Sequence, residues 1–135
     1  MDTKGKEVIG VIGGSGIDQL DGLEGVRQET VVTPFGSPSD ALILARLGQQ
    51  DLVFLPRHGR GHRIPPSQIN FRANIYALKM MGCTQIISLS AVGSLKEEIC
   101  PGTFVVIDQF IDRTFSRTKS FFDSGLVCHV ALGNP

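Results

Sequence analysis

Apolar positions in the first half of the chain come in short runs that turn-forming residues interrupt. The run at residues 8–12 is rich in β-branched side chains and stops at the glycine-rich residues 13–16. This pattern is typical of a buried strand that enters a tight turn. Two more apolar runs, at residues 41–45 and 52–55, flank the turn residues 48–50. They predict two strands joined by a short turn.

A helical pattern follows these strands. Apolar side chains recur at helical spacing within residues 67–81, where Ser67 can serve as the N-cap and Gly82 can end the helix. Apolar runs at residues 86–89 and 104–107 predict two further strands. Strands interleaved with a helix predict an α/β fold, in which ligands gather where the carboxyl ends of strands meet loops.

The composition fits one domain without a global electrostatic field. The chain has 135 residues, of which 41% are hydrophobic, and we expect a single domain over residues 1–135. Thirteen basic and thirteen acidic residues cancel, so the net charge predicts neither a nucleic-acid partner nor a membrane partner. Any anion site must therefore be local.

Cysteine usage and the start of the chain bear on the compartment. Cys83, Cys100 and Cys128 are widely spaced and form no CxxC pair, which argues against a disulfide framework and against a structural zinc site. The first seven residues contain no apolar run of signal-peptide length, and no later run could span a bilayer. We therefore expect a soluble, cytoplasmic protein.

The first candidate site is the loop at residues 13–16, Gly-Gly-Ser-Gly. Its missing side chains let backbone N–H groups approach an anion, and Ser15 adds a hydroxyl donor at the end of the predicted strand. The loop lacks the Lys of a Walker loop, the third glycine of GxGxxG and the final glycine of GxSxG, the pattern of a serine hydrolase elbow. It predicts a phosphate cradle, with a plain tight turn as the alternative.

The second candidate site is a basic loop at residues 57–63. It holds five side chains that can carry positive charge, directly after a predicted strand. A guanidinium offers paired donors that match phosphate oxygens, and an imidazole beside it can donate or titrate. The cluster predicts an anion site, with a solvated basic loop as the alternative. His58 and His62 have i, i+4 spacing, but the glycines between them disfavour a helix, so we do not expect this spacing to place the rings on one face or to make a metal pair.

The third candidate site follows the predicted strand at residues 86–89. Ser90 can donate from its hydroxyl and Ala91 from its backbone N–H. Ser and Gly after a strand are also ordinary turn residues, which is the alternative here. Asp108 and Asp112 follow the last predicted strand, where they could orient the arginines of a basic site or hold a sugar hydroxyl, with surface salt bridges as the alternative.

Five segments, in order, resemble methylthioadenosine phosphorylases, which belong to the trimeric type of the purine nucleoside phosphorylase family. Their Arg-His-Gly-Arg and Asp-Gln-Phe-Ile-Asp sequences are far more specific than any glycine turn. The segments are residues 11–16, 33–40, 57–62, 70–75 and 108–114. The resemblance implies the N-terminal part of the nucleoside phosphorylase fold, a twisted mixed β-sheet flanked by helices.

The resemblance also implies a reaction and its site. The reaction is phosphorolysis of 5′-methylthioadenosine to adenine and 5-methylthioribose 1-phosphate, with inorganic phosphate as co-substrate and without a metal or an organic cofactor. His129 would line the methylthio pocket of a neighbouring subunit, because family members assemble as trimers that sometimes pair into hexamers. No catalytic residue is assigned with it. The family's phosphate ligands carry over to Ser15, Arg57, His58, Ser90 and the backbone of Ala91.

Two alternatives to the methylthioadenosine phosphorylase hypothesis stay open. Family members are longer than this chain, which ends at Gly133-Asn134-Pro135, so we expect a truncated nucleoside phosphorylase domain. The residues that choose the base lie in the part that the chain lacks, which leaves a purine nucleoside or methylthioinosine phosphorylase of 6-oxopurine specificity as an alternative. An alternative of another class is an inactive phosphate-binding fragment that assembles with full-length subunits.

Overall fold

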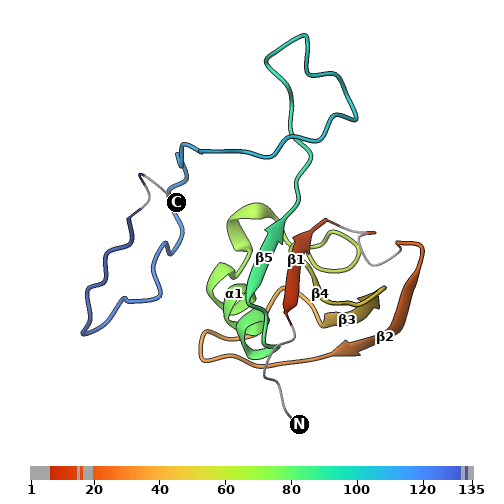
Figure 1. Cartoon of the computed structure of the whole chain (residues 1–135). Coiled ribbons are helices and arrows are strands. Elements are labelled where there is room, and N and C mark those ends of the chain that lie inside the picture. The colour runs from red at the N-terminus through yellow and green to blue at the C-terminus, as the bar shows by residue number, and fades with distance from the viewer. Residues whose placement is uncertain (1–6, 15, 17–19, 132, 134–135) are drawn as a thin grey trace.

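The described residues form a mixed five-stranded sheet with one α-helix packed against it (Figure 1). The structure is a computed structural model that describes residues 7–14, 16, 20–131 and 133. Within them the order of elements is β1 (Val8–Gly13), β2 (Leu23–Glu29), β3 (Leu42–Leu47), β4 (Gln50–Pro56), the 3₁₀ turn η2 (Pro66–Gln68), α1 (Phe71–Met80) and β5 (Gln85–Ser88).

The strands lie in the order β2-β3-β4-β1-β5. β1 is central among three parallel strands, because it pairs in parallel with β4 on one side and with β5 on the other. β3 pairs antiparallel with both β4 and β2. The mixed sheet with its packed helix confirms the predicted α/β class.

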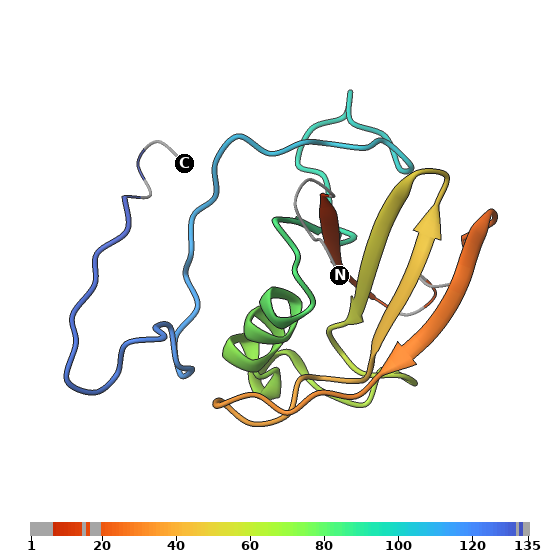
Figure 2. The same ribbon diagram turned by 60° about the horizontal axis from the view of Figure 1, so that its bottom comes forward.

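Alternation along the strands divides the core between the two faces of the sheet. In β4, Val53 and Leu55 pack with Leu78 of α1, whereas Leu52 and Phe54 belong to a second cluster. Successive side chains of a strand point to opposite faces, so a strand buried on both faces reads as one continuous apolar run. This is why the run at 52–55 was visible in the sequence. Figure 2 shows the twist of the sheet from β1, seen nearly end-on, to β2.

Gly10 lets α1 approach the sheet closely. A Cβ atom at this position would lie 3.3 Å from Sγ of Cys83 and 3.3 Å from both terminal methyl carbons of Leu78. Leu78 is fully buried, so its side chain has little room to move aside. The glycine in the middle of β1 is therefore a packing requirement of the helix above it.

The helix begins later than the sequence predicted. Ser67 lies in the 3₁₀ turn η2, and the N-cap of α1 is Asn70, whose side chain accepts a hydrogen bond from the backbone N–H of Ala73 at 3.1 Å. The predicted N-cap is wrong because Ile69, with φ −63° and ψ 125°, is extended and separates the 3₁₀ turn from α1. The predicted end is confirmed, since Gly82 has φ +81° and its N–H donates to the carbonyl of Lys79.

The observed strands differ from the predicted ones in three further respects. Gln50, which was assigned to a turn, is the first residue of β4. β2 was not predicted, because most of its residues are exposed and it pairs along one edge only, so no apolar run marks it. The predicted strand at 104–107 is wrong: the segment is exposed, and none of the described strands pairs with it. A strand is stable only where a neighbour accepts and donates its ladder hydrogen bonds.

The chain beyond β5 leaves the sheet. Figure 1 shows residues 90–131 as two long excursions, one past the carboxyl ends of the strands and one on the far side of α1. None of the described helices has the length and apolarity that crossing a bilayer demands.

The packing at Gly10 predicts a strong effect of a larger side chain. Gly10→Val should lower the free energy of unfolding by about 1–3 kcal/mol, because overpacking forces Leu78 or the backbone to shift. Urea unfolding followed by circular dichroism measures this change. Gly93→Val is the matched control, since a Cβ there meets no atom within 4 Å, and it should stay close to wild type. Equal stability of the two variants would contradict the packing argument.

Candidate functional site

The candidate site lies where three parallel strands end side by side. β4, β1 and β5 are adjacent in the sheet, so their carboxyl ends meet at one edge. The N–H of Arg57 donates to the carbonyl of Gly13 at 3.0 Å, and the N–H of Leu89 donates to the carbonyl of Ile12 at 2.8 Å. These bonds continue the pairing to the very ends of the strands. The three loops that the sequence marked as anion sites are therefore neighbours.

The guanidinium of Arg57 joins two of these loops. Its Nη1 donates to the carbonyl oxygen of Leu89 at 2.6 Å, and its Nε donates to Nε2 of His58 at 3.1 Å. An arginine has five N–H donors, and the other three have no acceptor among the described residues. The guanidinium of Arg57 is thus held in place at the strand ends, and three of its five N–H donors stay available for an anion.

His58 is buried and its tautomer follows from its partners. Its Nδ1 lies 2.8 Å from the carbonyl oxygen of Ile64. Because an arginine can only donate, Nε2 of His58 must accept from Arg57, and Nδ1 must carry the proton that goes to Ile64. Both ring nitrogens are in use in this form. Among the described residues, no three His, Cys, Asp or Glu side chains come together as a metal site.

The backbone of the basic loop turns through left-handed conformations. Gly59 and Gly61 have φ +69° and +76°, and His62 also has a positive φ, 56°. The absence of a helix here was predicted from the two glycines. The two rings nevertheless lie together without a helix, because the left-handed residues stack His62 on His58 with ring centroids 4.2 Å apart.

The remaining predicted site residues lie in separate parts of the chain. Ser15 lies outside the described residues. Ser90 and Ala91 are exposed and follow directly on Leu89, whose carbonyl binds Arg57, so the third loop begins at the site. His129 is exposed in the last excursion of the chain, which lies beyond α1 and away from the strand ends (Figure 1).

The acids after β5 do not take the orienting role that the sequence allowed. Asp112 is exposed and accepts hydrogen bonds from the side chain and the backbone N–H of Thr114, which together lower the pKa of its carboxyl. Asp108 is exposed as well. The acid that contacts arginines of the basic loop is Asp40, from the segment between β2 and β3.

Asp40 was missed as a site residue. Its Oδ2 accepts from the backbone N–H of Arg60 and lies 3.6 Å from Nη2 of Arg63, while its Oδ1 accepts from the N–H of Ala41 at 2.8 Å. Partial burial works to raise the pKa of Asp40, but the two backbone hydrogen bonds and the charges of Arg63 and Arg60 outweigh it and hold the pKa below its usual value. Nothing in the sequence links residue 40 to residue 60, so only the fold reveals the contact.

A buried polar pair fixes the neighbour of Asp40 to the helix. The N–H of Ser39 donates to Oδ1 of Asn74 at 2.8 Å, and Nδ2 of Asn74 donates to Oγ of Ser39 at 2.9 Å. Both residues are buried, and Asn74 is only 2% exposed. A buried amide is tolerated when its hydrogen bonds are satisfied, so this pair specifies how the segment before β3 sits on α1.

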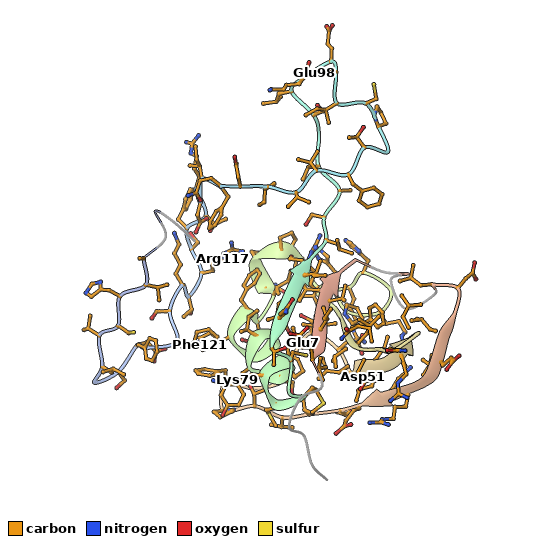
Figure 3. The ribbon with its side chains drawn as sticks, in the orientation of Figure 1. Glu7, Asp51, Lys79, Glu98, Arg117 and Phe121 are labelled. Carbon is orange, nitrogen blue, oxygen red and sulfur yellow. The ribbon has the colours of Figure 1, made fainter. Side chains whose placement is uncertain are left out.

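A separate pocket lies between α1 and the excursion that follows residue 111. It has a volume of about 200 Å³ and shares no residue with the basic loop. The excursion contacts the helix side through Phe121, whose ring packs edge-on against Phe35 with centroids 5.2 Å apart, and through Arg117, which lies over the ring of Phe71. Figure 3 shows Phe121 beside α1 and Glu98 at the tip of the other excursion.

The model of the phosphorylase superfamily matches residues 8–135 of this chain. The chain belongs to the phosphorylase superfamily. The chain is 59% identical over 128 residues to an S-methyl-5′-thioadenosine phosphorylase of Rhodospirillum rubrum, a match that covers 95% of this chain and 44% of the relative. It is 52% identical over 140 residues to the S-methyl-5′-thioadenosine phosphorylase of Danio rerio, covering 100% of this chain and 50% of that protein.

Solved structures give the same result for the fold. A methylthioadenosine phosphorylase from an antarctic soil metagenomic library superimposes with a TM-score of 0.90 at 46% identity, over 97% of this chain and 46% of that one. The methylthioadenosine phosphorylase of Schistosoma mansoni in complex with tubercidin has a TM-score of 0.86 at 45% identity, over 96% and 47% of the two chains. The predicted nucleoside phosphorylase fold is confirmed. The chain spans about half the length of the relatives that it matches.

The Ser39–Asn74 pair predicts a loss of stability when its amide is removed. Asn74→Ala should lower the free energy of unfolding by about 1–3 kcal/mol, because the buried N–H and hydroxyl of Ser39 lose their partner. Chemical denaturation of both proteins measures the difference. Asn74→Asp, which keeps only the acceptor, should also destabilise. Wild-type stability of the Ala variant would contradict this role of the amide.

The lowered pKa of Asp40 predicts a pH-dependent contribution to stability. A carboxyl whose folded pKa is depressed stabilises the fold above its unfolded pKa, near 4, and loses this contribution as the pH falls through the folded value. The difference in unfolding free energy between wild type and Asp40→Asn should therefore be constant above about pH 5 and shrink below about pH 4. Denaturation series from pH 3 to about pH 7 test this. A difference that does not vary with pH would contradict it.

Proposed function

We propose that this chain supplies the phosphate-binding part of an enzyme that cleaves S-methyl-5′-thioadenosine by phosphorolysis. The observation that carries the proposal is the guanidinium of Arg57, held between His58 and the carbonyl of Leu89 at the shared edge of β4, β1 and β5. The substrate follows from relatives that are named S-methyl-5′-thioadenosine phosphorylases. We infer that the complete protein acts on the same nucleoside.

The proposed reaction is one displacement at the sugar. A phosphate oxygen forms a bond to the anomeric carbon of the ribosyl group while the bond from that carbon to the purine nitrogen breaks. Adenine leaves with one proton, which balances the proton that hydrogen phosphate loses, and the sugar becomes 5-methylthioribose 1-phosphate. Positive charge develops on the ribosyl ring, so a phosphate held on one face supplies the nucleophile and stabilises that charge. Neither a metal nor an organic cofactor enters this scheme.

The proposed ligands come from the three neighbouring loops. Arg57 would bind two phosphate oxygens with its open N–H donors, and the hydroxyl of Ser90 would bind a third from the loop after β5. His58 orients Arg57 in the structure. For its ring to donate to phosphate as well, Nε2 must take a proton and release Nε of Arg57. The remaining donors would be the hydroxyl of Ser15 and the backbone N–H of Ala91.

We also propose a homo-oligomer, a trimer or a pair of trimers, in which His129 serves a neighbouring subunit. In this chain the last segment lies on the side of α1 that faces away from the sheet (Figure 1). A residue so far from its own phosphate site is better placed for a neighbour's nucleoside. We expect no nucleic-acid partner and no membrane partner.

Phosphate binding and turnover test the proposal together. Arg57→Ala should weaken the binding of inorganic phosphate by about ten- to hundredfold, the usual effect of losing hydrogen bonds to a charged group. Isothermal titration calorimetry with inorganic phosphate measures this in the 135-residue chain. Adenine release from methylthioadenosine, with and without phosphate, is measured in parallel beside a full-length relative. Inosine and methylthioinosine as competing substrates test the choice of base.

Arg46→Ala is the control for the loss of a positive charge. Arg46 is exposed on β3 and pairs with Asp51, at the other end of β4 from Arg57. Its removal should leave phosphate binding unchanged. Equal phosphate affinity of wild type and Arg57→Ala would refute the proposed site. Adenine release that does not depend on phosphate would refute the proposed reaction.

A further inference from the structure

Asp40 connects two segments of the chain through its carboxylate. It belongs to the connection between β2 and β3, but both contacts of its Oδ2 are with the loop after β4: the backbone N–H of Arg60 and the guanidinium of Arg63. Its other oxygen accepts from the N–H of Ala41 at 2.8 Å. The side chain is 16% exposed, so these contacts are partly shielded from water. Hydrogen bonds to a carboxylate are stronger than bonds between neutral groups.

Arg60 lies within a loop whose two ends are joined by hydrogen bonds, and these bonds lead to Arg57. The loop closes on itself where the N–H of Ile64 donates to the carbonyl of His58 at 2.9 Å, and the carbonyl of Ile64 binds Nδ1 of His58 at 2.8 Å. Nε2 of His58 then accepts from Nε of Arg57. Fixing the backbone at Arg60, between these partners, fixes the ring of His58 and with it the direction of Arg57.

Asp40 is itself held on a rigid base. Its neighbour Ser39 is bound through backbone and side chain to Asn74 of α1. The loop packs tightly here, since a Cβ on Gly59 would lie 3.1 Å from the carbonyl oxygen of Ser39. The hydrogen bond from Arg60 to Asp40 therefore connects the loop to the helix and the sheet.

The charge of Asp40 works against the binding of an anion. A carboxylate close to a phosphate site repels phosphate, and its ion pair with Arg63 neutralises one cation of the loop. Its position at this loop is therefore unfavourable for phosphate in electrostatic terms alone. The two effects of removing Asp40 have opposite signs, because lost repulsion tightens phosphate binding and lost geometry weakens it.

We propose that Asp40 is a positioning residue of the phosphate site: it holds the backbone of Arg60 and the head of Arg63, sets the shape of the loop at residues 57–63, and so aims Arg57 at phosphate. This inference rests on the proposed function, because it takes Arg57 as the main phosphate ligand. Asp40 does not touch phosphate. It acts through the loop.

The sign of the change in phosphate affinity tests the proposal. Asp40→Asn keeps the size of the side chain, removes its charge and leaves one acceptor oxygen instead of two. It should weaken the binding of inorganic phosphate about tenfold, as expected for the loss of one hydrogen bond to a charged group. Calorimetric titration of the 135-residue chain measures the dissociation constant, and circular dichroism confirms that the variant is folded. Unchanged or tighter binding by the folded variant would overturn the proposal.

Asp51→Asn is the matched control. It removes the same charge and also breaks a pair with an arginine, Arg46, but at the other end of β4. Its phosphate affinity should equal that of wild type, and a tenfold loss would mean that Asp40→Asn acts through general destabilisation. Arg57→Ala separates the two proposals. If Arg57→Ala loses binding and Asp40→Asn does not, the phosphate site stands and the role of Asp40 falls; if Arg57→Ala binds as wild type does, the proposed function falls.

A measurement without phosphate tests the same link. Nitrogen-15 spectra of the histidine rings report which nitrogen of His58 carries the proton, and the Nε–H signal of Arg57 reports its hydrogen bond. In wild type His58 should have its proton on Nδ1, as its two partners require. Asp40→Asn should shift both signals, whereas Asp51→Asn should leave them in place. Unshifted signals in Asp40→Asn would overturn the proposal even if phosphate binding were too weak to measure in every variant.

Discussion

The parallel pairing of β1 with both of its neighbours is the constraint on which the site depends. Parallel strands all end at the same edge, so the loops after β4, β1 and β5 must emerge next to one another. The pairing is exact in register up to the last residues, where Arg57 and Leu89 still bond to the backbone of β1. The helix can approach this sheet closely only because Gly10 leaves room under Leu78. Packing and site position thus both depend on β1.

The site itself is held by polar contacts. Asn74 is satisfied by Ser39, Asp40 by Arg60, and His58 by Arg57 and Ile64. Each contact leads from the rigid α1 and sheet toward a loop that is rich in positive charge and left-handed backbone. Such networks are costly when partly satisfied and specify one geometry when complete. No buried side-chain nitrogen or oxygen among the described residues lacks a partner.

Membership of the phosphorylase superfamily gives this arrangement its chemical meaning. The guanidinium of Arg57 at the shared strand ends suits the proposed reaction, whose nucleophile is inorganic phosphate. Much apolar surface beyond β5 is exposed, including Phe104, Val106 and Ile111. The relatives are about twice as long, since the chain covers 44% of one and 50% of another. The nucleoside side of the proposed reaction therefore depends on more than the contacts seen within this chain.

The sequence by itself determined the buried strands, the end of the helix and the chemistry of the loops. The strands at residues 8–12 and 52–55 could be predicted because strands buried on both faces are continuously apolar. The end of the helix at Gly82 could be predicted because glycine adopts the positive φ of a helix end without steric cost. Arg57 and His58 stood out because a charge cluster after a strand is unusual. Tertiary structure alone decided what pairs with what. The strand predicted at 104–107 found no partner, β2 formed without an apolar run, and Asp40 met Arg60 across the fold. The local sequence pattern predicts the burial of a residue and the conformation of its backbone. It does not predict which residue distant in sequence will contact it, because that contact forms only when the chain folds.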